Sequence, residues 1–353
     1  MKLLSLLPPG LTLLGFLLCC GASPPVLEAV GKESRPPYPG FHRQAMRELV
    51  QDLSAYARRI EPGFIVVPQN GLGLLTEDGT PEGAVVEPYL RSVDGVGQEE
   101  LFYGYPRFGQ PTPPDSTRYL LEFLRLARER GKTVLIIDYC RRPETVADSY
   151  RRSAGEGFLS FAAPHRELDA IPSHPRPGMN PDDVLQLSRA RNFLYLINPG
   201  SFASPRLFLK ALGATGYDLL VVDAFVASER GGSRWLTAAE VGSLQRKPSG
   251  GKRLVLAYLS IGEAESYRYY WRREWDRLGD GVPDTAGPPW LEGENPQWRG
   301  NYKVRYWDPG WRSILYGGSE AYLDGILARG FDGVYLDLVD AYLYFEAQLQ
   351  SIH

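Results

Sequence analysis

Acidic side chains stand at the ends of two short apolar runs in this chain. Asp337 ends the run that begins at Asp332, and Glu99 and Glu100 end an earlier run. Two carboxyl groups that share a cleft can hydrolyse a glycosidic bond, one as proton donor and the other as nucleophile or base. We therefore predict a catalytic pair made of Asp337 and either Glu99 or Glu100.

The alternation of side chains along the first run supports this position for Asp337. Val334 and Leu336 suit a face that packs against helices, which turns Tyr335 and Asp337 toward the opposite, interior face. A carboxylate there is desolvated unless it is paired or takes part in chemistry. A structural ion pair is the alternative that we weigh against catalysis.

Further polar and aromatic residues near strand ends are candidates for substrate binding. Gln69 and Asn70 can hydrogen-bond substrate hydroxyl groups, whereas Asp138, Asp223 and Glu263 are equally suited to ion pairs with nearby arginines. The predicted binding residues are Gln69, Asn70, Asp138, Asp223, Tyr258, Glu263, Glu265, Trp307 and Tyr335.

These side chains stand in or after eight runs of β-branched and aromatic residues, which we predict to be strands. Helix-like segments separate most of the runs. Alternating β and α units indicate an α/β fold, and eight of them predict a single-domain (β/α)8 TIM barrel with its chemistry at the strand C-termini. Barrel closure would place the eighth and second strands about 10 Å apart, at about 4.8 Å per strand. The predicted strands are Phe64–Asn70, Ser92–Glu100, Thr133–Asp138, Asn192–Asn198, Asp218–Asp223, Leu254–Glu263, Tyr302–Asp308 and Asp332–Asp337.

Two long insertions, 139–191 and 264–300, follow the third and sixth predicted strands. Long loops at the carboxyl ends of barrel strands usually carry function. The second insertion is rich in aromatic residues, which can either stack on sugar rings or pack the loop itself. These residues are Tyr267, Tyr269, Tyr270, Trp271, Trp275, Trp290 and Trp298.

The composition argues against several other classes of protein. A net charge of −3 and a sequence pI near 5.9 leave no basic stripe for nucleic acid. None of the four histidines ends a predicted strand, so we expect no metal site and no cofactor. Cys140 has no histidine near it in sequence, and we interpret it as a packing residue rather than a nucleophile.

The N-terminal residues predict export. Lys2, the apolar segment Leu11–Leu18 and the small residues after it resemble a signal peptide over residues 1–22, with lipidation at Cys20 as an alternative to release. The Pro-rich segment 23–40 is expected to be a tether, followed by the barrel domain over 41–353. We expect an extracellular, periplasmic or lipid-anchored protein whose only contact with a membrane would be such an anchor.

Three long motifs resemble glycoside hydrolase family 114, the endo-α-1,4-polygalactosaminidase family of TIM barrels. They are Tyr258–Arg268, Arg305–Trp311 and Phe331–Asp340, and the match extends to Val67–Gly71 and Glu99–Tyr103. The resemblance covers most of residues 41–345. It implies hydrolysis of an α-1,4-linked, galactosamine-containing exopolysaccharide, and an acidic pair that corresponds to Asp337 and Glu99.

The order of these motifs departs from the family pattern. In relatives, the segments that correspond to Val67–Gly71 and Glu99–Tyr103 are expected after the Asp337 strand, whereas here they precede it. This order predicts a circular permutation, which a closed barrel with adjacent termini tolerates. A non-catalytic surface lipoprotein that binds glycans in the same cleft is the rival hypothesis to an exported glycosidase.

Overall fold

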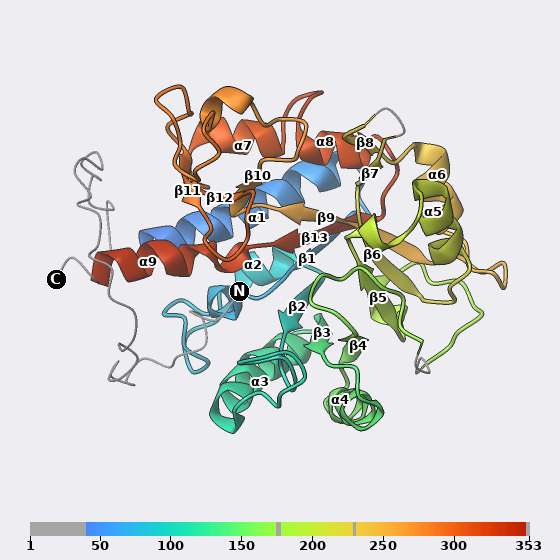
Figure 1. Cartoon of the computed structure of the whole chain (residues 1–353). Coiled ribbons are helices and arrows are strands. Elements are labelled where there is room, and N and C mark those ends of the chain that lie inside the picture. Colours follow the sequence, from blue (N-terminus) through green and yellow to red (C-terminus); the bar gives the residue numbers. More distant parts are fainter. Residues whose placement is uncertain (1–39, 174–177, 229–230, 351–353) are drawn as a thin grey trace, which may run out of the picture.

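The computed structural model describes residues 40–173, 178–228 and 231–350, with parallel strands at the centre and helices around them (Figure 1). One parallel sheet has five strands in the order β1 (Ile65–Pro68), β13 (Gly333–Asp337), β9 (Leu254–Ser260), β6 (Leu219–Asp223) and β5 (Phe193–Leu196). A second parallel sheet has the order β2 (Gly95–Glu99), β3 (Thr133–Tyr139) and β4 (Leu159–Ala163). These strands are buried almost throughout, as their apolar sequences predict.

The two sheets meet along two boundaries. Beyond the end of β1, Gln69 forms a parallel bridge with Gly97 of β2, and the Asn70 amide donates to the Gly97 carbonyl at 2.8 Å. At the other boundary β4 contacts β5. The structure thus confirms a mixed α/β fold with parallel strands, in an order consistent with a barrel-like fold. Closure of the eight strands into one barrel stays a prediction.

Amphipathic helices cover the strands. The apolar positions of the first helix, among them Ala45, Leu49, Leu53 and Ala57, are buried. The α-helices are α1 (Phe41–Ile60), α2 (Glu87–Ser92), α3 (Pro114–Glu129), α4 (Pro143–Gly155), α5 (Pro205–Gly213), α6 (Ala238–Leu244), α7 (Pro309–Leu315), α8 (Tyr322–Leu327) and α9 (Tyr342–Gln350). Short 3₁₀ segments are η2 (Leu72–Leu75), η3 (Leu187–Arg189), η4 (Pro199–Ser201), η5 (Arg273–Trp275) and η6 (Val339–Ala341).

One predicted parallel strand was wrong, and one parallel strand was missed. The segment Tyr302–Asp308 contributes only β12 (Asn301–Val304), which lies antiparallel between β10 (Glu263–Glu265) and β11 (Leu291–Glu294). The remaining parallel strand is β4, which pairs with β3 and lies with α4 inside the predicted insertion 139–191. Two further strands, β7 (Phe225–Ala227) and β8 (Ser233–Trp235), form an antiparallel pair.

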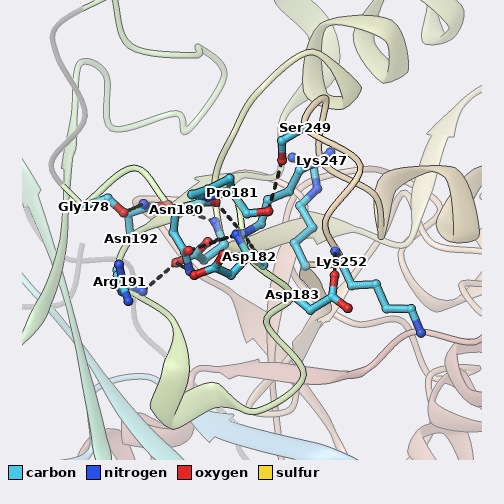
Figure 2. Close-up of polar contacts among 12 residues, drawn as sticks. Gly178, Asn180, Pro181, Asp182, Asp183, Arg191, Asn192, Lys247, Ser249 and Lys252 are labelled. Atoms are coloured by element: carbon cyan, nitrogen blue, oxygen red, sulfur yellow. Dashed lines mark hydrogen bonds and ion pairs between the residues drawn. The ribbon is translucent and has the colours of Figure 1, made fainter.

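A buried ion pair fixes the chain at the N-terminal end of β6, away from the strand C-termini (Figure 2). The Lys247 ammonium donates to Asp218 Oδ1 at 2.6 Å and to the carbonyls of Asn180 and Asp182 at 2.8 and 2.7 Å. Asp218 Oδ2 also accepts from the Arg191 amide at 2.8 Å. These bonds hold the loop before β5 against the loops before β6 and β9.

The predicted signal peptide and nearly all of the predicted tether lie outside the described residues. Within the described part of the chain, none of the helices combines the length and apolar character needed to cross a membrane.

Candidate active site

A pocket of about 310 Å³ opens at the carboxyl ends of the parallel strands, where the sequence places its acidic residues. Its walls come from β2, β3, β5, β6, β9, β10 and β13 and from the loops beside them, including the loop after β4. The residues used below are Glu99, Glu100, Tyr139, Arg166, Glu167, Tyr195, Asp223, Tyr258, Glu265, Tyr267, Arg268, Trp298, Arg299 and Asp337. We call this the strand-end pocket.

Asp337 is held in the strand-end pocket by three hydrogen-bond donors. Its Oδ1 accepts from Gln69 Nε2 at 2.9 Å and from the Leu338 amide at 2.8 Å. Its Oδ2 accepts from the Tyr258 hydroxyl at 3.0 Å. The residue is only 7% exposed, so these donors replace most of the water that a carboxylate requires. They also fix the direction in which the carboxyl group faces the pocket.

Glu99 is held in a similar way from the neighbouring strands. Asn70 Nδ2 donates to Glu99 Oε2 at 3.2 Å, and Asn70 Oδ1 accepts from the Glu99 amide at 3.2 Å. The Tyr139 hydroxyl donates to Glu99 Oε1. Glu99 is also 7% exposed. Each of the two predicted catalytic carboxyls is therefore positioned by one carboxamide and one phenol.

Gln69 and Asn70 were predicted to bind substrate, but they do not line the pocket. Both carboxamides are buried, and each is directed at one of the two carboxyl groups. Gln69 and Asn70 thus lie outside the pocket wall, and their hydrogen bonds orient the carboxyl groups of Asp337 and Glu99.

The backbone is unusual where these strands end. Among the described residues, four other than glycine have positive φ: Asn70, Glu100, Leu168 and Leu338, with φ between 51° and 61°. Asn70, Glu100 and Leu338 directly follow Gln69, Glu99 and Asp337, and Leu168 lies in the pocket wall. The left-handed conformation is costly for side chains with a Cβ, so it persists where the surroundings enforce it, often at functional sites. Here the left-handed conformation turns the chain sharply just after Gln69, Glu99 and Asp337.

Two tyrosines pack near the two carboxyl groups. The rings of Tyr195 and Tyr335 have centroids 5.0 Å apart, and burial raises the pKa of both far above its ordinary value, with Glu99 and Asp337 adding to the shift. A side chain at Gly97 would collide with the Tyr335 hydroxyl, which explains the glycine there. Tyr335 was predicted to bind substrate, but it lies outside the pocket wall.

Glu100 forms an ion pair with Arg166 in the same pocket. Burial raises the pKa of Glu100; the Arg166 charge lowers it and the Glu99 charge raises it further. The Arg166 guanidinium also lies 4.9 Å from the centroid of the Tyr139 ring and donates to the Gly104 carbonyl. Arg166 thus joins the loop after β4 to the groups around Glu99.

Asp223 and Glu265 share one buried arginine on another wall of the pocket. Arg268 Nη1 donates to Asp223 Oδ1 at 2.8 Å, and Arg268 Nε donates to Glu265 Oε2 at 2.6 Å. The ion pair with Arg268 that the sequence allowed for Asp223 is therefore present. Two carboxylates on one guanidinium leave this wall with a net negative charge.

The prediction that Asp138 contacts substrate does not fit its position. Asp138 is fully buried and accepts hydrogen bonds from the amides of Phe102 and Tyr103 at 2.9 and 3.1 Å and from Ser149 at 2.6 Å. Burial raises its pKa to about 6. Side-chain alternation along β3 turns Tyr139, rather than Asp138, toward the pocket. Tyr139 could have been found by applying that alternation to β3.

Glu263 and Trp307 also lie outside the strand-end pocket. Glu263 pairs with Lys303 at 3.3 Å and accepts from Asn295 at 2.7 Å within the small antiparallel sheet, where burial raises its pKa. Trp307 packs against His42 and Phe345, with ring centroids 4.8 Å away in both cases. Their positions favour structural roles over the predicted substrate contacts.

The aromatic insertion divides into a packed group and an exposed group. Trp275 packs against both Trp271 and Trp290, at 5.1 and 5.2 Å between ring centroids. Tyr267 and Trp298, by contrast, are exposed and line the pocket. Packing therefore explains part of the set, while two rings remain available to a ligand.

Cys140 is buried, and burial raises the pKa of its thiol to about 12. A thiol that stays protonated is a poor nucleophile, which agrees with a packing role. Among the described residues, no group of three or more histidine, cysteine, aspartate or glutamate side chains is arranged to hold a metal ion.

In a comparison with known protein families, residues 215–351 match glycoside-hydrolase family GH114. The match confirms the resemblance predicted from the motifs in this part of the chain. It includes Asp223, Tyr258, Glu265 and Asp337, whereas Glu99 lies outside the matched residues.

Three curated relatives are uncharacterized proteins. One from Deinococcus radiodurans is 42% identical over 134 residues, which cover 38% of this chain and 37% of that protein. One from Methanocaldococcus jannaschii is 47% identical over 94 residues, covering 26% of this chain and 23% of that protein. One from Thermotoga maritima is 41% identical over 90 residues, covering 26% and 24% respectively. The chain thus matches well under half the length of each relative.

Proposed function

From the similarity of residues 215–351 to glycoside-hydrolase family GH114, we propose that this chain is a glycosidase. The observation that carries the proposal is the placement of Asp337 and Glu99 in the wall of one pocket, each held by a carboxamide and a phenol. Positioned carboxyl pairs of this kind hydrolyse glycosidic bonds.

In the proposed reaction, one carboxyl group donates a proton to the oxygen of the leaving sugar. The other attacks the anomeric carbon or activates the attacking water. Gln69 and Tyr258 orient Asp337, while Asn70 and Tyr139 orient Glu99. Fixing both groups before the substrate arrives reduces the reorganisation that the reaction would otherwise require.

We propose an α-1,4-linked, galactosamine-containing exopolysaccharide as the substrate. The charge of the strand-end pocket supports this choice, since its wall carries six carboxylates and three guanidinium groups. An excess of carboxylates attracts a sugar that carries a free ammonium group. The six acidic residues are Glu99, Glu100, Glu167, Asp223, Glu265 and Asp337, and the three basic residues are Arg166, Arg268 and Arg299.

We further propose that the chain is an exported, circularly permuted (β/α)8 barrel. The pairing of C-terminal β13 with N-terminal β1, and the bridge between Gln69 and Gly97, support closure of the barrel because they bring Asp337 and Glu99 to one pocket despite their separation in sequence. The permutation rests on the order of the motifs along the chain. Export rests on the sequence of residues 1–22, and N-terminal sequencing of the mature protein tests it.

The test is incubation of the purified protein with galactosamine-rich exopolysaccharide, followed by mass spectrometry of the released oligosaccharides. Asp337→Asn and Glu99→Gln should each lower the rate by at least about a hundredfold while thermal unfolding stays unchanged. Glu129→Gln, which changes an exposed carboxylate on α3, is the matched control and should retain the wild-type rate.

Wild-type activity in both pocket variants would refute the assignment of the acidic pair. Binding of the polysaccharide without any product from the wild type would instead establish a glycan-binding protein.

A further inference from the structure

A second pocket, of about 530 Å³, adjoins the strand-end pocket and is built largely from the insertion 264–300. Tyr267 and Arg299 line both pockets, so the two pockets lie on either side of these residues. Trp271, Arg273 and Glu294 line the second one alone. We call it the insertion pocket.

Tyr267, at the junction, presents an exposed ring that is held rigidly. The residue is 57% exposed, yet its hydroxyl donates to Glu265 Oε1 at 2.6 Å. The Arg268 guanidinium lies 5.1 Å from the ring centroid, over the ring. The hydrogen bond to Glu265 and the contact with Arg268 together fix the orientation of the ring although much of it faces solvent. A ring that is fixed on one side and open on the other is suited to stacking against the apolar face of a sugar.

Gly300 keeps the junction open beside this ring. A Cβ at Gly300, whose φ is 88°, would lie 3.0 Å from Ser266 Oγ and 3.7 Å from the Tyr267 ring. Any side chain at this position would therefore occupy space in the insertion pocket beside Tyr267.

The polar groups of the insertion pocket differ from those of the strand-end pocket. Asp276 already accepts from the amides of Gly279 and Gly281 at 2.8 and 3.0 Å, and from the Tyr302 hydroxyl at 2.5 Å. Arg273 and Arg299 are exposed, and neither guanidinium has a hydrogen bond or ion pair with any other described residue. The carboxylates of Asp276 and Glu294 balance the two guanidinium groups in this pocket, and the guanidinium groups suit hydroxyl and acetamido oxygens better than a further ammonium group.

We propose that the insertion pocket binds the next sugar residues of the same polysaccharide, in neutral or N-acetylated form, with Tyr267 as the platform between the two pockets. This inference rests on the proposed function, because it takes the strand-end pocket to hold the sugar at the scissile bond. It adds a requirement for length: an oligosaccharide must reach from the carboxyl pair past Tyr267 to Arg273.

The experiment measures binding, so that it does not depend on turnover. Asp337→Asn protein is titrated calorimetrically with partly N-acetylated α-1,4-galactosamine oligosaccharides, from disaccharide to octasaccharide. Affinity should rise steeply over the first few sugar residues and then level off. Adding Arg273→Ala should lower the affinity for the long oligosaccharides about fivefold to tenfold and leave the shortest ones unchanged, since one charged hydrogen-bond donor is lost.

Arg272→Ala in the same Asp337→Asn protein is the matched control, because Arg272 is the exposed neighbour that lines neither pocket and should leave all affinities unchanged. Equal affinity for short and long oligosaccharides would overturn the proposal, as would an unchanged length dependence in the Arg273→Ala protein. Length-dependent binding lost with Arg273→Ala, but without cleavage by the wild type, would support the second site and refute the glycosidase. Absence of binding at every length would refute both.

Discussion

Replacement of Lys247 by methionine should destabilise the protein by about 3–5 kcal/mol, the usual cost of removing one partner from a buried ion pair. The side chains of Lys247 and Asp218 are 1% and 0% exposed. Methionine retains the apolar stem of lysine but removes three hydrogen bonds of 2.6–2.8 Å. Asp218 would then be left as a buried carboxylate without its cation.

The assay is equilibrium unfolding in urea, followed by tryptophan fluorescence. The Lys247→Met protein should unfold at a lower urea concentration with an unchanged m-value. Lys252→Met is the matched control, because the Lys252 side chain is exposed and its replacement should change the free energy of unfolding by no more than about 0.5 kcal/mol.

A double-mutant cycle separates the ion pair from other effects. Since Asp218→Asn removes the charge that Lys247 neutralises, the double variant should lose clearly less than the sum of the two single variants. A loss below about 1 kcal/mol for Lys247→Met, or strict additivity in the cycle, would refute the reasoning.

Three more predictions follow from other contacts. Tyr139→Phe removes a donor to Glu99 and should lower kcat about tenfold with little change in KM, as steady-state kinetics on the polysaccharide will show; an unchanged kcat would argue against positioning. His42 has a pKa lowered by burial to about 4, so the folded state loses up to about 3 kcal/mol of stability as pH falls from about 6.5 to about 4. His42→Phe should flatten that part of the pH–stability curve, and an unchanged slope would contradict it. Trp307→Ala should lower the melting temperature and spare KM, because Trp307 packs against His42 and Phe345; a raised KM at unchanged stability would restore it as a binding residue.

The sequence predicted the parallel strands well where their runs are long, buried and apolar. β9 and β13 are examples, since central parallel strands must be hydrophobic on both faces. It failed at β4, whose Leu159–Ala163 segment is short, and at Tyr302–Asp308, where only the first residues form a strand and that strand belongs to a small antiparallel sheet. A local pattern shows that a segment is extended, but not which strand it will pair with.

The site was predicted less completely than the strands. Sequence reasoning brought Asp337 and Glu99 to the strand ends, and both line the pocket. It could not show that Gln69 and Asn70 face those acids rather than the ligand, because such contacts span 268 and 29 residues of sequence. It also favoured Asp138 over Tyr139 because a carboxylate is the more reactive residue type. Side-chain alternation along β3, however, determines which of the two side chains enters the pocket.

The aromatic insertion has a further consequence for how such a protein can change. The antiparallel sheet of β10, β12 and β11 joins the insertion to the residues that flank it, and rings of the insertion pack on the rest of the fold, with Trp290 5.0 Å from Trp311 and Tyr269 5.8 Å from Phe225. The two positioned acids stand on β2 and β13, outside this segment. Because Glu265 and Arg268 tie the start of the insertion to Asp223 in the pocket, changes that alter which polymer is accepted while the two acids stay in place belong in the part of the insertion beyond Arg268.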